Sequence, residues 1–179
     1  MSTKTTDSPF ESIFPDRTIV HTTDSNGNIF GWLALPSAAA LPETAKRLAA
    51  HGARLCAITA FNEEKFSCGG NMELVYNFDL DGAVLNVSIP VTPDDRCVPS
   101  LVNDFTNADW HEREFAELFE VKLTGRDAPK RLFLDPDIDS GVFNRLIPLS
   151  SMMNGASTKR LWETIFAETS MPDWAKEAK

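Results

Sequence analysis

Charged side chains of both signs are concentrated in one short stretch of the chain, residues 107–119. Glu114 and Glu117 stand three residues apart within it, with Arg113 beside them. On a helix this spacing brings the two carboxylates to one face, and a close carboxylate pair can perform acid–base chemistry when it is buried. The chain has no nucleophile motif, no glycine-rich phosphate loop and no zinc-binding histidine motif to accompany the pair. We therefore expect no catalytic residue here.

Histidine and cysteine do not form a metal-binding pattern either. The histidines are scattered without metal-ligand spacing: His21, His51 and His111. Cys56, Cys68 and Cys97 are odd in number and lack a C-x-x-C pair, which predicts reduced thiols and no iron–sulfur cluster in this chain alone. Cys56 lies in an apolar run and is predicted to be in the core. A free-standing thiol-dependent enzyme or redox sensor using Cys68 or Cys97 is an alternative function.

Residues 107–119 have the local signals of a helix, with Asn107 as a candidate cap and no Gly or Pro inside. At about 100° per residue, an apolar and a charged face separate. The apolar face consists of His111, Phe115, Leu118 and Phe119. The charged face consists of Trp110, Arg113, Glu114 and Glu117. Such a face is usually solvated, but a large exposed aromatic usually has a partner, so we predict that this face contacts another protein. Glu112, at the apolar edge, is expected to form an internal bridge.

The residues that follow complete a longer pattern. Trp110-x-Glu112-Arg113-Glu114-x-x-Glu117-x-Phe119, followed by Gly125 and Lys130-Arg131-Leu132, resembles the signature of the thirty-kilodalton subunit family of respiratory complex I, the NADH dehydrogenase. The same module occurs in energy-converting, membrane-bound nickel–iron (NiFe) hydrogenases. This chain has Glu117 where the family pattern has Asp, Glu120 where it has Gly, and Arg126-Asp127 where it has His-Pro. The His-Pro-Leu-Arg-Lys run of complex I proteins is absent. These departures favour the hydrogenase type.

The resemblance implies a non-catalytic accessory subunit that binds no cofactor itself. Its expected partners are a large NiFe-hydrogenase-like subunit, a small iron–sulfur subunit and a ferredoxin-like subunit, which would hold the nickel–iron site and the iron–sulfur clusters. The expected partner interface comprises Trp110, Arg113, Glu114, Glu117, Lys130 and Arg131. The expected structural residues of the signature are Glu112, Phe115, Phe119 and Gly125. Complex I itself, in which the chain would serve NADH-linked quinone reduction, is the alternative assembly.

Length and composition fit one globular domain. The chain has 179 residues, is 42% hydrophobic and has a formal net charge of −9, which argues against nucleic-acid binding. No apolar run approaches the roughly 20 residues that span a bilayer, and residues 1–7 lack a signal-peptide core. These features predict a cytoplasmic protein without a membrane span of its own. The resemblance places it at the inner face of the cell membrane through its complex.

The predicted fold is α+β: a two-layer sandwich of a mixed four- to five-stranded sheet with helices on one face, plus a C-terminal helical extension. Residues 16–134 form the expected domain, 1–15 a flexible N-terminus, and 135–179 a loop, a helix at 158–168 and a tail. Strands at 28–35 and 54–61 flank a helix at 42–51, which predicts two parallel strands in one sheet. A short helix is expected from residue 99 to 105.

The hairpin around Asp81-Gly82 gives the most specific structural prediction. An Asp-Gly pair suits a two-residue type I′ turn. Folding the chain there brings apolar residues opposite one another at alternate positions. The predicted pairs are Leu80 with Ala83, Phe78 with Leu85, Tyr76 with Val87, Leu74 with Ile89 and Met72 with Val91. A shift of one residue would move this apolar set to the other face, so the pattern determines the register.

Overall fold

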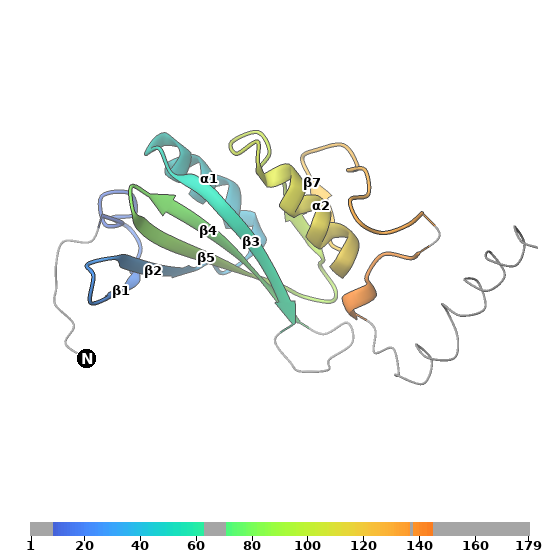
Figure 1. Ribbon diagram of the computed structural model, residues 1–179, viewed down its shortest axis with the longest axis horizontal. Helices are drawn as coiled ribbons and strands as arrows, with labels where there is room; N and C mark the ends of the chain where they lie inside the picture. Colours follow the sequence, from blue (N-terminus) through green and yellow to red (C-terminus); the bar gives the residue numbers. More distant parts are fainter. Residues whose placement is uncertain (1–8, 63–70, 137, 145–179) are drawn as a thin grey trace, which may run out of the picture. The chain divides into compact units, whose positions relative to one another are not determined.

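The structure is a computed structural model, and it describes residues 9–62, 71–136 and 138–144. Within these residues the elements are β1 (Val20–Thr23), β2 (Ile29–Ala34), η1 (Ala38–Ala40), α1 (Leu41–Ala50), β3 (Arg54–Asn62), β4 (Met72–Leu80), β5 (Ala83–Val91), β6 (Cys97–Pro99), α2 (Ala108–Phe119), β7 (Lys122–Thr124) and η2 (Val142–Asn144) (Figure 1). The helix expected at 158–168 lies outside the described residues, as does Cys68.

A mixed sheet of five strands, in the order β1-β2-β5-β4-β3, forms the centre of the fold. β2 and β5 pair in parallel, and the other neighbours are antiparallel. β2 and β3 therefore run in the same direction, as predicted, but the β4–β5 hairpin separates them. A mixed five-stranded sheet with two helices confirms the α+β class. The two-layer arrangement and the C-terminal extension stay predictions.

The β4–β5 hairpin has the predicted register at all five apolar pairs, from Leu80↔Ala83 to Met72↔Val91. Asp81 and Gly82 have φ values of 52° and 91°, and a type I′ turn requires positive φ at both positions. The amide of Gly82 donates to Asp79 Oδ1 at 3.0 Å. This bond ties the turn to the strand before it.

One face of the sheet is buried, and residues from both helices belong to the same apolar cluster. The cluster includes Leu74, Tyr76, Phe78, Leu85 and Val87 of the sheet, Leu41 and Leu48 of α1, and Phe115 and Phe119 of α2. Phe10, Ile13 and Phe14 also belong to it. The expectation of a flexible N-terminus therefore does not hold for residues 9–15. Gly31 makes room for Phe10, because a Cβ at residue 31 would lie 2.5 Å from Cε2 of Phe10.

Two local predictions were wrong. The segment expected as a helix, 99–105, begins with Pro99, which is the last residue of β6, and β6 pairs in parallel with β7. The rest of the segment contains one turn, in which the amides of Asp104 and Phe105 donate to the carbonyl of Leu101. Cys56 is exposed rather than in the core. The pairing register of β3 shifts between Leu55 and Ala57, so the strand does not alternate regularly where Cys56 stands.

Candidate functional site

Helix α2 is fixed to the sheet at its start and, at its end, to one segment that precedes it and one that follows it. Asn107 does not cap the helix as expected: its backbone is already helical, and its Nδ2 instead donates to the carbonyl of Leu55 in β3 at 2.6 Å. The helix ends at Phe119, and the next residue, Glu120, has a left-handed backbone with φ of 56°. The carbonyl of Phe119 then accepts hydrogen bonds from Arg96 Nη1 at 2.8 Å and Asn144 Nδ2 at 2.6 Å. These donors satisfy a helix end that would otherwise lack partners.

Glu112 forms the internal bridge that the sequence predicted. It is fully buried, and its carboxylate accepts from Ser100 Oγ at 2.7 Å, the amide of Leu101 at 2.6 Å and Arg126 Nη1 at 2.9 Å. Arg126 also binds Asp109 at 2.5 Å. The hydrogen bond from Arg126, with its positive charge and that of Arg113, lowers the pKa of Asp109 from its usual value. A buried carboxylate with this many donors is satisfied rather than strained.

Glu117 does not lie on an exposed charged face, and that part of the prediction was wrong. Its side chain is only 5% exposed. The carboxylate accepts hydrogen bonds from the backbone amides of Leu132 at 2.8 Å, Phe133 at 2.5 Å and Leu134 at 3.2 Å. The segment after β7 folds back over this side of the helix and covers Glu117. We call that segment, residues 126–136 and 138–144, the α2 loop.

Arg113 holds the same loop one turn earlier on the helix. Its Nε donates to the carbonyl of Lys130 and its Nη2 to that of Arg131, both at 2.8 Å. Its guanidinium carbon lies 5.9 Å from the centre of the Trp110 ring, within range of a cation–π contact. Arg131 in turn donates from Nη1 to the carbonyls of Asp135, at 2.8 Å, and Ile138. Gly125, with φ of 79°, makes the turn that leads into the loop.

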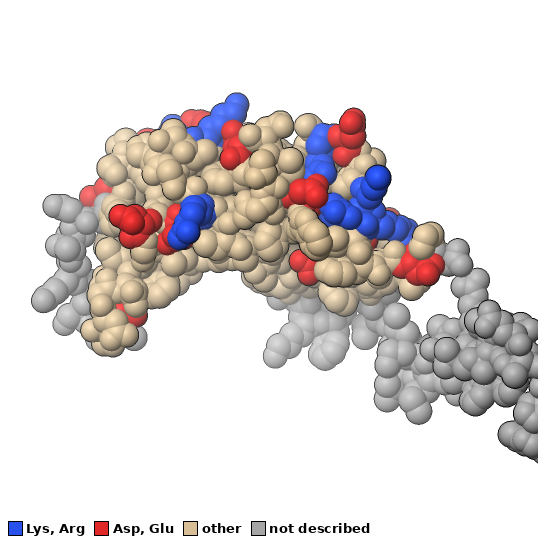
Figure 2. All heavy atoms as spheres, turned by 45° about the horizontal axis from the view of Figure 1, so that its top comes forward, with Lys and Arg blue, Asp and Glu red and all other residues tan. Residues whose placement is uncertain are grey.

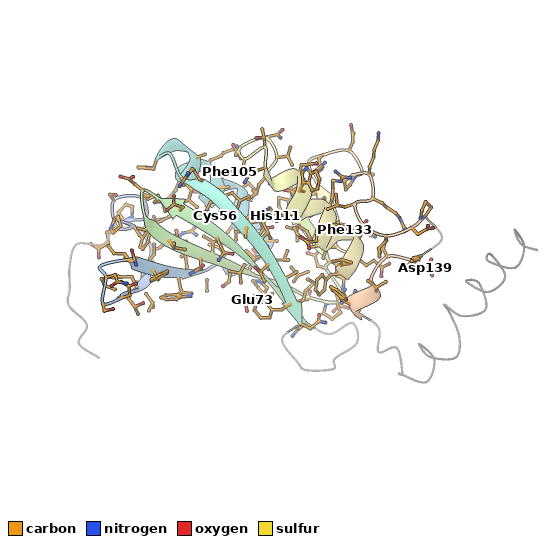
Figure 3. All side chains as sticks on the ribbon, viewed as in Figure 1. Cys56, Glu73, Phe105, His111, Phe133 and Asp139 are labelled. Carbon is orange, nitrogen blue, oxygen red and sulfur yellow. The ribbon has the colours of Figure 1, made fainter. Side chains whose placement is uncertain are left out.

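Large apolar side chains are exposed on α2 and its loop. Trp110 and Phe133 are each 64% exposed, and Ile138 and Phe143 are exposed as well. The ring of Phe143 stands edge-on to that of Phe119, with centroids 5.4 Å apart. Figure 3 shows Phe133 next to α2. Sequence reasoning selected Trp110 and missed the loop residues. Their signal was large apolar side chains within a segment rich in Asp and Pro.

The charged residues expected at the interface differ in how exposed they are. Lys130 and Arg131 are exposed, while Arg113 and Glu114 are partly exposed. An open pocket of about 410 Å³ lies between α2 and its loop, lined by Val102, Asp109, Arg113, Arg126, Asp127, Ala128, Pro129 and Lys130. Figure 2 shows basic and acidic side chains next to one another in this part of the molecule. The pocket is therefore lined by side chains of both charges.

Residues 9–62, 71–136 and 138–144 contain neither a metal-binding cluster nor a membrane span. No group of three or more His, Cys, Asp or Glu side chains in these ranges could hold a metal ion. No helix within the described chain is long and apolar enough to cross a membrane. Cys97, like Cys56, is exposed.

Residues 36–159 match a protein family described as the respiratory-chain NADH dehydrogenase 30 Kd subunit. A segment of 73 residues is 30% identical to the C subunit of the NADH-quinone oxidoreductase of Chloroherpeton thalassium, covering 39% of this chain and 30% of that protein. A segment of 43 residues is 46% identical to the J subunit of the NAD(P)H-quinone oxidoreductase of Synechococcus sp., covering 24% of each. The matched segments thus span less than a third of these relatives' length.

A polypeptide in the structure of the membrane-bound sulfane sulfur reductase (MBS), an archaeal respiratory membrane complex, has a similar fold. The TM-score is 0.63 at 14% sequence identity, covering 82% of this chain and 89% of that one. At this identity the likeness concerns the fold alone.

Proposed function

The chain belongs to the family of the respiratory-chain NADH dehydrogenase 30-kDa subunit, and from that premise we propose that it is a non-catalytic assembly subunit of a membrane-associated electron-transfer complex. In this proposal it docks on the large NiFe-hydrogenase-type subunit of an energy-converting hydrogenase, at the inner face of the membrane. The nickel–iron site and the iron–sulfur clusters belong to the partner subunits. Two departures from the family pattern, Glu120 and Arg126, support the hydrogenase type over complex I.

The observation that carries the docking role is the exposed apolar surface of α2 and its loop. We use the name α2 surface for the exposed large apolar side chains of α2 and its loop, which are Trp110, Phe133, Ile138 and Phe143. Exposed aromatics at the centre of a contact commonly supply most of its binding energy. Clusters of exposed large apolar side chains commonly mark a contact with another molecule.

The polar residues of the signature support this role by fixing the loop in place. Arg113 and Glu117 bind five backbone groups of residues 130–134 between them. Phe133 is therefore presented from a segment whose backbone is already ordered. Association then costs less conformational entropy than it would with a mobile loop. The signature thus contributes to docking largely through the loop it holds, with Trp110 in direct contact.

Membership of respiratory complex I itself, as its 30-kDa subunit, is the second candidate function, and the names of the two sequence relatives favour it. Purification of the complex from the native host separates the two candidates. Recovery with nickel-containing large and small subunits supports the hydrogenase. Recovery with flavin-binding, NADH-oxidising subunits supports complex I and overturns the hydrogenase assignment.

The docking role is tested with Trp110→Ala, because Trp110 is exposed and belongs to the α2 surface. Loss of a hot-spot aromatic costs about 2 kcal/mol or more, which is roughly a thirty-fold weaker association with the rest of the complex. The free energy of unfolding of the isolated chain should fall by no more than about 1 kcal/mol, from loss of the Arg113 contact. Lys46→Ala, an exposed helical position on α1, is the control and should change neither quantity. A Trp110→Ala chain that unfolds more easily yet assembles normally would refute the docking role.

A further inference from the structure

The two edge strands of the five-stranded sheet differ in how they are protected against pairing with another chain. β3 begins with the charged residue Arg54, contains an irregularity between Leu55 and Ala57, and receives the Asn107 side chain on the Leu55 carbonyl. Charges, bulges and covering elements are the usual means of preventing strand addition. The edge next to α2 therefore has several of these protections.

β1, at the opposite edge, is short, which itself limits strand addition, but among the described residues it has no Lys, bulge or covering element. Its four residues, Val20–Thr23, include neither Lys nor Pro, and all four pair regularly with β2. Within residues 9–62, 71–136 and 138–144, no segment pairs with the outer side of β1. That side presents unpaired backbone donors and acceptors of a kind that readily bind an extended chain.

An apolar pair lies directly beside this edge. Val20 is 66% exposed and Trp32 is 47% exposed, and the two are register partners in β1 and β2. Asn86 of β5 is the next cross-strand partner, so Val20, Trp32 and Asn86 form a row across three strands. Asn86 accepts a hydrogen bond from Asn77 Nδ2 at 2.5 Å and donates one to the carbonyl of Gly31 at 3.2 Å. The row is uncharged and internally bonded. An apolar residue on an added strand would find Val20 beside it and Trp32 one strand further in.

We propose that β1 accepts an extended segment of another subunit of the same complex as a sixth strand, with an apolar side chain next to Val20. This inference rests on the proposed function, because it needs a complex that the α2 surface has already joined. The backbone of the segment would pair with the free edge of β1, and Val20 with Trp32 would favour an uncharged, apolar residue at the position beside them.

The size of the edge favours such a segment over a second copy of this chain. Four residues extend over about 13 Å, and stacked sheets lie about 10 Å apart, which limits the thickness of one sheet, so the edge offers on the order of 130 Å² at most. A stable dimer needs about 800 Å² from each partner. A segment of a subunit already docked through the α2 surface needs far less, because its effective concentration is in the range of about 1 mM or more.

Hydrogen exchange tests the proposal at those backbone amides of residues 20–23 that point away from β2, in the isolated full chain and in the complex purified from the native host. We expect at least about tenfold slower exchange in the complex, since a paired edge is protected. Val20→Lys introduces a charge at an exposed edge position, and this variant should stay in the complex through the α2 surface but lose the protection. Thr59→Lys, at an exposed position of β3, should keep it.

Each other outcome overturns the proposal. Equal exchange in the free chain and in the complex refutes strand addition, as does protection that survives Val20→Lys. Protection already present in the isolated chain and lost on deletion of residues 1–8 would identify the chain's own N-terminus as the occupant. A dimer of the isolated chain that Val20→Lys dissociates would identify a second copy. Failure of the docking role is separate, because it shows as normal assembly of Trp110→Ala.

Discussion

Replacing Glu117 by Ala should detach the α2 loop. The carboxylate is buried and accepts three backbone hydrogen bonds, from Leu132, Phe133 and Leu134. A hydrogen bond to a charged group contributes about 1.5–3 kcal/mol, so three of them give an upper limit of roughly 5–9 kcal/mol. The loop can leave the helix, however, and its amides then bind water. We therefore expect a smaller loss, about 3 kcal/mol, in the range measured when one partner of a buried charged interaction is removed.

Urea denaturation of the isolated chain measures this loss. With a slope of about 2 kcal/mol per molar urea, a loss of about 3 kcal/mol lowers the midpoint by roughly 1.5 M. Hydrogen exchange adds a local measurement, because the amides of residues 132–134 should lose their protection first. Glu114→Ala is the matched control: the same residue type one turn earlier, partly exposed, and expected to cost under about 0.5 kcal/mol.

The reasoning fails if the free energy of unfolding of the Glu117→Ala variant lies within about 0.5 kcal/mol of that of the natural chain. It also fails if the stability falls but the amides of residues 132–134 stay protected, because the loop would then be held by other contacts. In a complex, Glu117→Ala should weaken assembly as Trp110→Ala does, since Phe133 is no longer held in place.

Two further predictions concern charge and packing. Because Arg126 lowers the pKa of Asp109 in the folded chain, this carboxylate stabilises the fold above its unfolded pKa of about 3.9, and the contribution is lost as the pH falls through the folded pKa. Urea titrations from pH 7 to 3 should show Asp109→Asn less stable than the natural chain at pH 7, with the difference shrinking below about pH 4; a constant difference would contradict this cause. Gly31→Ala should cost about 1–3 kcal/mol, because its Cβ would meet the Phe10 ring and Leu85. In a Phe10→Ala background the same change should cost much less, and equal costs in the two backgrounds would show that Phe10 is not the obstacle.

The hairpin register could be predicted from the sequence because every determinant is local. Residues 72–80 and 83–91 alternate apolar and other side chains, and the Asp81-Gly82 turn fixes where they meet. The bridge of Glu112 was also predictable, because a carboxylate at the edge of an apolar face needs a donor. Its donors could not be named, since Ser100 and Arg126 come to it from two other segments.

The burial of Glu117 could not be predicted from helical periodicity. That pattern assigns a side chain to a face of the helix but does not tell whether a later segment covers the face. Here the covering amides come 15 to 17 residues further along the chain. The positions of Phe10 and Phe133 could not be predicted for a similar reason. Phe10 belongs to a short run with Ile13 and Phe14, and Phe133 stands between Leu132 and Leu134. Neither run is long enough to establish a helix or strand period, so the sequence did not distinguish the aromatic that enters the core from the one that stays exposed.

The hydrogen bonds between α2 and its loop also bear on the order in which the chain folds. Those made by Arg113 and Glu117 join residues 15 to 18 positions apart. The parallel contact of β2 with β5, represented by Asn86 and Gly31, joins residues 55 positions apart. Closing the shorter segments costs about 1 kcal/mol less in chain entropy. Topology then favours early formation of the local unit and late formation of the parallel strand pair. A chain emerging from the ribosome would complete its central hairpin first, and the α2 surface would follow within about 25 residues of the end of the helix, as soon as Asn144 is available to bind Phe119.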